Sequence, residues 1–398
     1  MGEGLRVAVI GGSLGGLLTA LELRAIGCNV HVYERSPVPL EGRGAGIVLH
    51  PVTTRFLERR RSIDLDRVGS SATTLRYLGP SGEVVLDEPV AYRFTSYATL
   101  HAALAAALEP DRYHLDRRLV TADPLEDDRV LARFADGSTV VADLVVGADG
   151  IRSTVRASLF PEARASYAGY VAWRGTVQDH DLPSSARGLR GLLTYHVGHR
   201  THMLTYEIPV PGPDAARSMN WVWYRNLDEA ALEALLTDRV GVVHDLSLPP
   251  GAVGVEHLRS LAVDAAALPP AFRDLVAATA EPFLQVIVDL AVPAMVHRRI
   301  CVLGDAAFSL RPHAAVGTAK AADDARALAS AIVAAGGDVS AALRTWDAER
   351  MQVGLAAMRR SRAIGERAQF SGSFVPGDPE VAFGLRAPKD GIYPDLAG

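Results

Sequence analysis

The residue types best suited to chemistry near the start of the chain are a run of glycines and an acid that follows it. Residues 11–16 read GGSLGG, and Glu34 comes 23 residues after Gly11. Glycines allow a tight turn and let the backbone approach a pyrophosphate, and a helix that starts at the turn offers unpaired N–H groups to its charge. An acid about 20 residues further on accepts hydrogen bonds from ribose hydroxyls. The pattern predicts a dinucleotide site, although Ser13 stands where the motif usually has its middle glycine.

The elements around these residues are the ones that such a site needs. Residues 7–10 have the composition of a buried parallel strand, and the leucines at positions 14, 17, 18 and 21 share one face of the helix that follows. Gly27 ends that helix, and residues 30–33 form a second strand that runs into the acid. We therefore expect a strand–helix–strand unit whose cofactor contacts are Gly11, Ser13, Leu14, Gly16 and Glu34.

Two further strand ends carry a glycine next to an aspartate. The buried strand over residues 144–146 ends in the sequence GADG, which contains Asp149, and the strand over residues 298–303 ends in GDAA, which contains Asp305. Between them, from Tyr167 onward, the strands carry interleaved Tyr, Trp and His, which is typical of an antiparallel sheet. The order of these segments predicts a parallel dinucleotide-binding domain that is interrupted by an antiparallel domain.

Taken together, the three motifs resemble those of the single-component flavoprotein aromatic hydroxylases, which share the fold of 4-hydroxybenzoate hydroxylase. Residues 149–156 (DGIRSTVR) fit that family's DGxxSxVR element, and residues 304–307 with Pro312 fit its GD element. The resemblance covers almost the whole chain. Residues 33–37, 167–175 and 311–315 resemble the branch of the family that hydroxylates dihydroxypyridines.

The resemblance implies FAD as the cofactor, NADH or NADPH and dioxygen as co-substrates, and a flavin 4a-hydroperoxide that transfers oxygen to an aromatic ring. The implied contacts of the adenosine, pyrophosphate and ribityl parts of FAD are, respectively, Glu34 with Arg35, Asp149, and Asp305. Glycine-rich residues 42–46 and the strand over 47–49 would leave a flat backbone for the flavin ring. A helix that begins at Gly317 would direct its positive end at the same ring. The implied ring contacts are Val48, Ala315, Val316, Gly317 and Thr318.

A base should help to deprotonate the ring hydroxyl of the substrate, and histidine suits that task near neutral pH. His313 is the first candidate, because it follows Pro312 in the loop that would pass over the flavin. His50 is the second candidate, because it stands at the end of the strand beside the ring. Either residue could instead be a structural histidine whose nitrogens are satisfied by hydrogen bonds.

The wall of the substrate pocket would come from the antiparallel sheet. The candidate substrate contacts are Tyr206, Trp223, Tyr224 and Pro312. Alternation along a strand places Trp221 and Trp223 on one face and Tyr224 on the other. Only one of the two sets can face the substrate, so we expect the other to pack in the core.

These expectations describe an α/β protein with a Rossmann-type FAD-binding domain, an antiparallel-sheet substrate domain and C-terminal helices over about 318–368. We assign residues 1–75, 98–165 and 285–370 to the FAD-binding domain, and residues 76–97 and 166–284 to the substrate domain. Residues 371–398 are rich in Gly and Pro and should form a loosely packed tail.

The composition limits the partners that we expect. A net charge of −5 gives no reason to expect nucleic acid or a membrane. Cys28 and Cys301 make neither a disulfide framework nor a metal motif, which fits a reducing cytoplasm. The histidines at positions 196, 199 and 202 would not converge on a strand, so we expect no metal. A homodimer is the usual form in the family that the chain resembles.

The sequence leaves three alternatives open. The first keeps the flavin chemistry but acts on another phenol, a hydroxynicotinate or a natural-product ring. The second is a flavin-binding protein without oxygenase activity, which NADH oxidation stimulated by a substrate would exclude. The third is a plain NAD-dependent dehydrogenase, which a colourless purified protein would favour.

Overall fold

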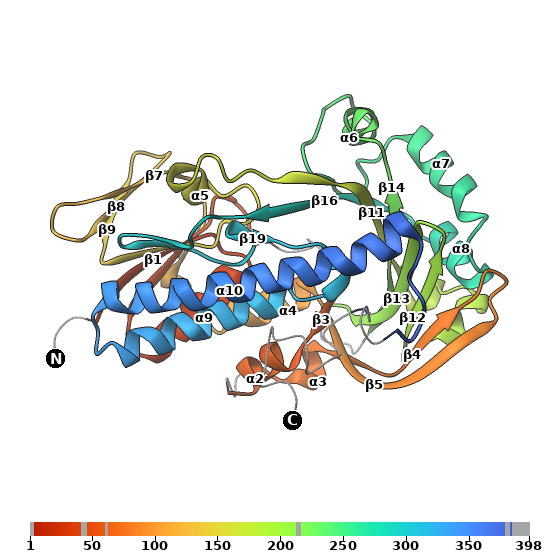
Figure 1. Ribbon diagram of the computed structural model, residues 1–398, viewed down its shortest axis with the longest axis horizontal. Coiled ribbons are helices and arrows are strands. Elements are labelled where there is room, and N and C mark those ends of the chain that lie inside the picture. Colours follow the sequence, from red (N-terminus) through yellow and green to blue (C-terminus); the bar gives the residue numbers. More distant parts are fainter. Residues whose placement is uncertain (1–3, 41–45, 60–62, 212–215, 379–382, 384–398) are drawn as a thin grey trace.

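The computed structural model describes residues 4–40, 46–59, 63–211, 216–378 and 383. In this part of the chain the strands form three sheets, and Figure 1 shows the two larger ones in opposite halves of an elongated molecule. The mixed α/β architecture agrees with the fold class expected from the sequence.

The first half contains the predicted strand–helix–strand unit. Its six-stranded sheet, counted over the described residues, has the order β17-β18-β10-β1-β2-β6. The strands are β1 (Arg6–Ile10), β2 (Asn29–Tyr33), β6 (Tyr113–His114), β10 (Leu144–Gly147), β17 (Val296–His297) and β18 (Ile300–Val302). β1 pairs in parallel with both β2 and β10, so that Ala8 lies opposite His31 and Val145. Helix α1 (Leu14–Ala25) makes the crossover between β1 and β2, as the sequence predicts.

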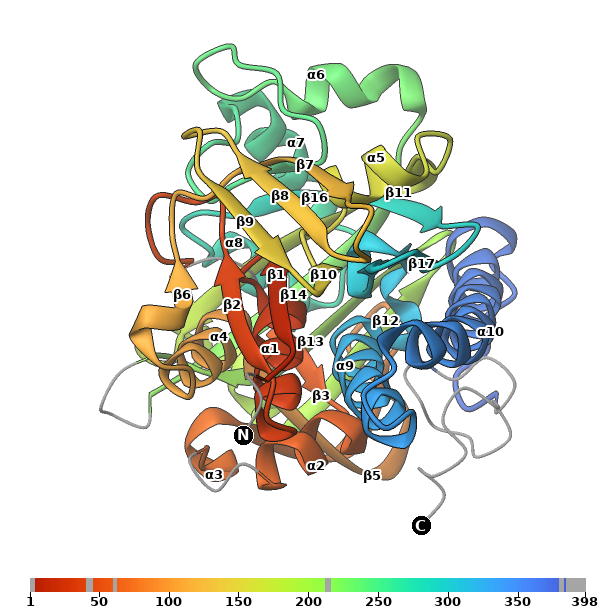
Figure 2. The same cartoon turned by 90° about the vertical axis from the view of Figure 1, so that its left-hand side faces the viewer.

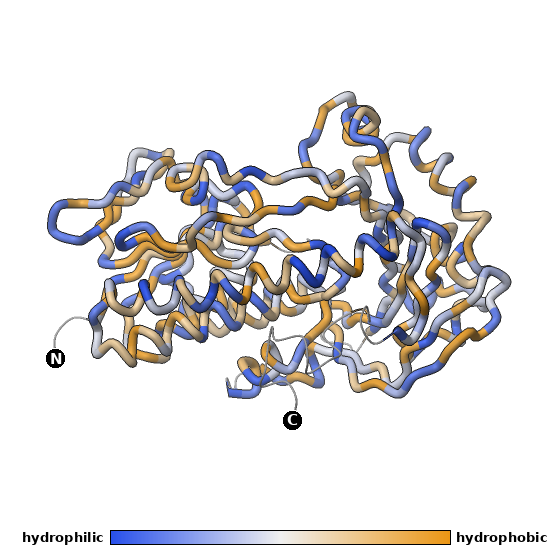
Figure 3. Tube along the Cα trace, in the orientation of Figure 1, coloured by the Kyte–Doolittle hydropathy of each residue, from blue (hydrophilic) through white to orange (hydrophobic). Residues whose placement is uncertain are grey.

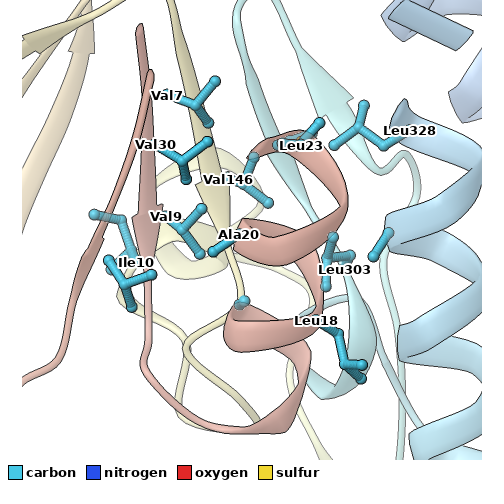
Figure 4. Packing of buried hydrophobic residues seen from close by; sticks show 14 of the residues in the cluster. Val7, Val9, Ile10, Leu18, Ala20, Leu23, Val30, Val146, Leu303 and Leu328 are labelled. Atoms are coloured by element: carbon cyan, nitrogen blue, oxygen red, sulfur yellow. The ribbon is translucent and has the colours of Figure 1, made fainter. Parts of the chain in front are cut away.

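The core of this half lies between the sheet and its helices. In Figure 4, valines of β1, β2 and β10 lie beside leucine and alanine side chains of α1. Leu328 of α9 (Gly317–Ala334) lies on the other side of α1. β-branched side chains on parallel strands that are covered on both faces explain the unbroken apolar runs in the sequence.

The second half is built on a ten-stranded sheet, again counted over the described residues, with the order β15-β16-β11-β14-β13-β12-β4-β5-β3 and with β19 paired to β16. Its strands are β3 (Gly46–Leu49), β4 (Ser70–Leu78), β5 (Val84–Ser96), β11 (Ser166–Gln178), β12 (Leu192–Gly198), β13 (Thr201–Pro209), β14 (Arg217–Asn226), β15 (Ser247–Leu248), β16 (Phe283–Ala291) and β19 (Phe308–Ser309). Helices α6 (Leu232–Leu236), α7 (Val255–Ala265) and α8 (Pro270–Ala277) accompany this sheet. The pairing is mainly antiparallel, as the sequence predicts, but β12 runs parallel to β4.

The strand pairing departs from the domain boundaries expected from the sequence. β3 and most of β4 fall within residues 1–75, yet both pair with β5 in the ten-stranded sheet. β16 also extends past residue 285 as a member of that sheet. Local patterns reveal that a segment is a strand, but the choice of partner strand depends on contacts between distant residues. The division into two domains otherwise stays a prediction.

The remaining elements support the two large sheets. A separate three-stranded sheet joins β7 (Leu119–Pro124), β8 (Val130–Phe134) and β9 (Thr139–Ala142). Helix α2 (Pro51–Arg59) follows β3 and is followed by α3 (Leu65–Val68), while α4 (Tyr97–Ala106) follows β5 and α5 (Thr154–Leu159) follows β10. Figures 1 and 2 show α9 and α10 (Val339–Gly365) side by side, with α10 extending from one half to the other. Along α10 the hydropathy alternates between polar and apolar, as Figure 3 shows, which suits a helix with one buried face.

Two local expectations are wrong. The strand expected over residues 298–303 begins only at Ile300, because Arg298 adopts a left-handed conformation (φ 53°) in the turn between β17 and β18. The tail is not loosely packed throughout, because Phe374 and Phe383 are buried and stack on each other against the ten-stranded sheet. Across the described residues, no helix combines the length and the apolar character that crossing a bilayer requires.

Candidate active site

The glycine turn after β1 has the geometry predicted for it. Gly11 adopts a φ of 104°, which favours glycine, and its N–H donates to the carbonyl oxygen of Tyr33. A Cβ atom on Gly16 would lie 1.8 Å from the carbonyl oxygen of Gly11. The turn and the first turn of α1 therefore touch so closely that no side chain fits between them. Leu14 is buried as the first residue of the helix.

Glu34 closes this turn from the end of β2. Its carboxylate accepts the N–H of Gly12 at 2.7 Å and the N–H of Ser36 at 2.9 Å, and the side chain is buried. The acid predicted to bind the adenosine ribose is therefore held in place by the backbone of the motif itself. Arg35 is exposed beside it.

Ser13, which replaces the usual glycine, has a partner that the sequence did not indicate. Its side chain makes no capping bond to α1, and its Oγ lies 2.8 Å from the hydroxyl oxygen of Tyr97. Tyr97 is the first residue of α4, and the side chain of Ser96, which caps this helix, accepts a hydrogen bond from the Thr99 N–H. The two hydroxyls place polar groups next to the glycine turn.

Asp149 has a structural task in its own turn. Its carboxylate accepts the N–H of Thr154 at 2.7 Å and a hydrogen bond from the Ser153 hydroxyl, so it fixes the start of α5. Burial raises the pKa of this carboxyl, and these hydrogen bonds oppose that shift. Asp149 therefore organises the strand end at which the sequence placed a pyrophosphate contact.

The third strand end opens onto a cavity of about 320 Å³ between the two halves of the molecule. Asp305 lies in a short 3-10 turn after β18 and lines this cavity. The cavity brings together most of the predicted ring and substrate contacts, which are Val48, Asp305, Pro312, His313, Ala315, Val316, Gly317, Thr318, Tyr206 and Tyr224.

The two sides of the cavity nearest Asp305 suit a flat ring. Residues 46–48 of β3 form one side, and residues 315–318 at the start of α9 form the other. A Cβ atom on Gly46 would lie 2.6 Å from the Tyr206 ring, so the backbone here is packed without room for a side chain. Residues 41–45, which include the predicted glycines before β3, lie outside the described residues. The close backbone packing, the helix N-terminus and the nearby carboxylate together fit the flavin end of FAD.

Strands β13 and β14 of the ten-stranded sheet form a further wall of the cavity. Tyr206 and Tyr224 are buried on neighbouring strands, and burial raises the pKa of both phenols, so both stay protonated at neutral pH. Trp223 is not part of this wall. It lies on the other face of β14 beside Trp221, and its indole N–H donates to the Thr201 hydroxyl at 2.9 Å. The alternation expected from the sequence is confirmed, and it excludes Trp223 as a substrate contact.

His313 reaches the cavity from the loop before α9. Its Nε2 lies 2.7 Å from the hydroxyl oxygen of Tyr170, while its Nδ1 has no hydrogen-bond partner among the described residues. Burial and the nearby Arg311 lower the pKa of His313 to about 3, so the ring is neutral at pH 7. The sequence led us to expect a base with a near-neutral pKa. His313 instead has a low pKa because it is buried.

The loop that carries His313 is anchored by an ion pair. Asp289 of β16 receives a two-pronged contact from Arg311, with nitrogen–oxygen distances of 2.9 and 3.1 Å, and a further hydrogen bond from Arg362 of α10. The side chains of Arg311 and Asp289 are mostly buried. Two fixed nitrogen–oxygen contacts restrict the orientation of the guanidinium, and they hold the loop against the sheet.

His50 lies behind the cavity wall. It is buried, its Nε2 lies 3.0 Å from the carbonyl oxygen of Ala315, and burial lowers its pKa to about 4. It is absent from the described lining of the cavity. His50 is therefore placed as a structural histidine, which was the alternative that the sequence left open for it.

Several cavity residues were not proposed from the sequence. Arg174 and His202 line the cavity, and Tyr170 lies on the same face of the sheet without lining it. Alternation along β11 and β13 could have identified these residues once the face was known. Phe383 lines the cavity and stacks on His202, a contact that no local pattern predicts. Within the described residues, no group of three or more His, Cys, Asp or Glu side chains is arranged to hold a metal.

Comparison with known proteins places this geometry in context. The family described as FAD binding domain-like matches residues 167–289. The chain is 38% identical over 385 residues to 2,6-dihydroxypyridine 3-monooxygenase of Paenarthrobacter nicotinovorans. The aligned residues make up 96% of this chain and 96% of the relative. It is 28% identical over 370 residues to 6-hydroxynicotinate 3-monooxygenase of Bordetella bronchiseptica, covering 87% of this chain and 88% of the relative.

Solved structures show the same similarity. The structure of 2,6-dihydroxypyridine-3-hydroxylase from Arthrobacter nicotinovorans matches with a TM-score of 0.90 and 37% identity, over 96% of this chain and 97% of that one. Klebsiella pneumoniae HpxO complexed with FAD and uric acid matches with a TM-score of 0.74 over 92% of this chain and 89% of that one. At 22% identity, the second match establishes likeness of fold only.

Proposed function

The chain belongs to the FAD-dependent aromatic-ring hydroxylases, and from that membership we propose that it hydroxylates a small hydroxylated pyridine with NADH and dioxygen as co-substrates. The observation that carries the choice of ring is the 38% identity over 96% of the chain to an enzyme named for 2,6-dihydroxypyridine. A relative named for 6-hydroxynicotinate and one named for 3-amino-4-hydroxybenzoate are each 28% identical, so the same chemistry on such a ring is the alternative.

The residues around the cavity fit the flavin end of FAD. We assign Val48 and the backbone of residues 315–318 to the two faces of the flavin ring, and Asp305 to the ribityl hydroxyls. Gly11, Ser13, Leu14, Gly16, Glu34, Arg35 and Asp149 are the remaining cofactor residues that we propose. When bound, FAD would take up electrons from the nicotinamide and activate dioxygen, one atom of which is transferred to the ring.

The protein orients the aromatic ring and excludes water from it. Tyr206 and Tyr224 form an aromatic wall, and Pro312 with Phe383 covers other sides of the cavity. Protonated phenols can donate one hydrogen bond each to oxygen or nitrogen atoms of a bound ring. Aromatic walls with a few polar groups are typical of sites that hold a small planar ligand.

We assign proton transfer to His313. When its Nε2–H donates to the hydroxyl oxygen of Tyr170, the lone pair of Nδ1 is left to accept a hydrogen bond from a ring hydroxyl of the substrate. A pKa of about 3 keeps His313 unprotonated before the reaction. The ring hydroxyl becomes more acidic as oxygen is transferred, and the proton then moves to Nδ1.

Two properties of the whole molecule complete the proposal. We propose that the protein functions as a homodimer, the usual form in the family, and size-exclusion chromatography with light scattering would test this. We place it in the cytoplasm, because both cysteines in the described residues are free and buried.

The decisive experiment follows NADH oxidation by the purified, FAD-loaded protein in air, with and without 2,6-dihydroxypyridine. Product and hydrogen peroxide are counted against NADH consumed. We expect strong stimulation with little peroxide. Stimulation with mostly peroxide would reject this ring and favour the alternative substrates. If no ring in a panel of hydroxylated pyridines and phenols stimulates oxidation, the protein is a flavin-binding protein without this activity, and the proposal is wrong.

A further inference from the structure

Arg174 is a charged residue of the cavity lining that neither the cofactor nor the proposed proton transfer uses. It lies on β11, where alternation places Tyr170, Ala172 and Arg174 on the face toward the cavity, and Val171 and Trp173 in the core on the opposite face. Arg174 therefore enters the site from the sheet.

The strand register gives the surroundings of Arg174. It lies opposite Val222 on β14, and Val222 lies opposite Leu204 on β13. On the same face, Tyr224 lies two residues along β14 from Val222, and Tyr206 lies two residues along β13 from Leu204. The two tyrosines therefore lie on opposite sides of the line of residues that contains Arg174. Burial raises the pKa of both phenols, and the charge of the Arg174 guanidinium opposes that rise; at Tyr224 a hydrogen bond with Arg174 opposes it as well. Arg174 thus lies within the aromatic wall that we assign to the substrate.

The charge of Arg174 has no acidic partner in the described residues. The other arginine of the cavity lining, Arg311, is paired with Asp289, whereas no ion pair between described residues involves Arg174. The Nε of Arg174 is buried without a hydrogen-bond partner among these residues. A partly buried cation without a counter-ion is costly, and an anion that enters the site removes much of that cost.

We propose that Arg174 receives an anionic oxygen carried by the aromatic substrate, so that the ring binds as an anion. This inference rests on the proposed function and deepens it. A planar guanidinium can donate two parallel hydrogen bonds to an anionic ligand, which a lysine cannot do. The anionic oxygen is either a deprotonated ring hydroxyl or a ring carboxylate, because both present the same acceptor. In a dihydroxylated ring, one oxygen would bind Arg174 as an anion while the other faces His313.

The test compares Arg174→Met and Arg174→Lys with the wild type and with Arg225→Met as the matched control. Arg225 lies on β14 of the same sheet but pairs with Asp264 over the ring of Trp223, on the opposite face. Binding is measured in the FAD-loaded proteins as a change in flavin absorbance during titration with 2,6-dihydroxypyridine, 6-hydroxynicotinate and neutral 2,6-dimethoxypyridine. Flavin content and the thermal midpoint report on folding.

We expect Arg174→Met to weaken binding of an anionic probe by about 10- to 100-fold, the loss typical of one charged hydrogen-bonded contact. The neutral probe should bind within about twofold of wild type, Arg174→Lys should be intermediate, and Arg225→Met should not differ from wild type. The wild-type affinity should fall as the pH drops below the pKa of the probe, and this dependence should be absent in Arg174→Met. A loss confined to 6-hydroxynicotinate would identify the carboxylate as the anionic group, and a loss with 2,6-dihydroxypyridine would identify the ring oxygen.

Other outcomes overturn the inference. Equal loss for neutral and anionic probes would make Arg174 a structural residue. Unchanged binding in Arg174→Met, with a wild type that binds the probes, would reject the role of Arg174 while the proposed function stands. A wild-type protein that binds no ring of either charge would reject the proposed function, and this inference with it.

Discussion

His50 and Ala315 are 265 positions apart in the chain, yet the Nε2 of the histidine lies 3.0 Å from the carbonyl oxygen of the alanine. The contact joins the end of β3 to the residue that precedes α9 by two positions. Ala315 adopts the left-handed conformation, with φ 53° and ψ 29°, which is unfavourable for a residue with a Cβ. Because Val48 and Ala315 line the same cavity from opposite sides, this hydrogen bond fixes the spacing between those sides.

The contact predicts what a substitution at His50 does. His50→Ala leaves the Ala315 carbonyl without its donor and creates a space in a buried region, so we expect a loss of stability of about 1–3 kcal/mol and weaker FAD binding. His50→Gln retains an N–H donor and should recover most of the FAD affinity. Thermal unfolding and flavin retention on a desalting column measure the two effects. If His50→Ala kept normal FAD affinity but lost the ionisation that governs turnover, His50 would be catalytic after all.

The sequence predicted the local features of the site much better than the long-range contacts. Gly11, Glu34 and the start of α9 at Gly317 could be predicted because a turn, a strand end and a helix start each leave a short-range pattern. The pairing of β3 with β5 and the contact of Phe383 with His202 left none, because they depend on segments that meet only in the folded chain. Burial is the other missing factor, since the low pKa of His313 follows from its surroundings and not from its neighbours in sequence.

Neighbouring glycines in the first turn of α1 should respond in opposite ways to alanine. A Cβ atom on Gly16 would lie 1.8 Å from the Gly11 carbonyl oxygen, whereas a Cβ atom on Gly15 would meet its nearest neighbours at 3.6 and 3.7 Å, which is ordinary contact. We expect Gly16→Ala to lose FAD and to be strongly destabilised. Gly15→Ala should keep the fold and gain about 0.5–1 kcal/mol from the better helix propensity of alanine. Flavin absorbance and urea unfolding test the pair, and equal behaviour of the two variants would contradict the close approach at Gly16.

Buried neutral histidines should make the fold sensitive to acid. Burial lowers the pKa of His50 to about 4 and that of His313 to about 3, from an ordinary value of 6.5. Between these values the unfolded chain binds protons that the folded chain does not, so stability is complete above pH 6.5 and is lost as the pH falls toward 3. From pH 7 to pH 5 each histidine should cost up to about 2 kcal/mol.

This acid sensitivity can be assigned to individual residues. The midpoint of urea unfolding at pH 7 and pH 5 should differ less in His50→Gln than in the wild type, because one of the titrating groups has been removed. His180→Gln is the control, because the His180 side chain is exposed beside Asp181. An equal pH dependence in His50→Gln and the wild type would show that other groups cause the acid lability.

The hydrogen bond between Tyr170 and His313 should matter for turnover rather than for cofactor binding. Tyr170→Phe removes the hydroxyl that lies beside Nε2 of His313, so the ring is no longer held with Nδ1 ready for the substrate. We expect kcat for the hydroxylated pyridine to fall about 10-fold, with FAD content unchanged, and a larger fall in His313→Ala. Tyr167→Phe is the control, because the Tyr167 hydroxyl on the same strand donates to the Leu227 carbonyl instead. If Tyr170 acts through His313, the double variant should be no slower than His313→Ala alone. Additive losses would show that Tyr170 acts independently of His313. Unchanged turnover in His313→Ala would remove His313 from the proposed chemistry.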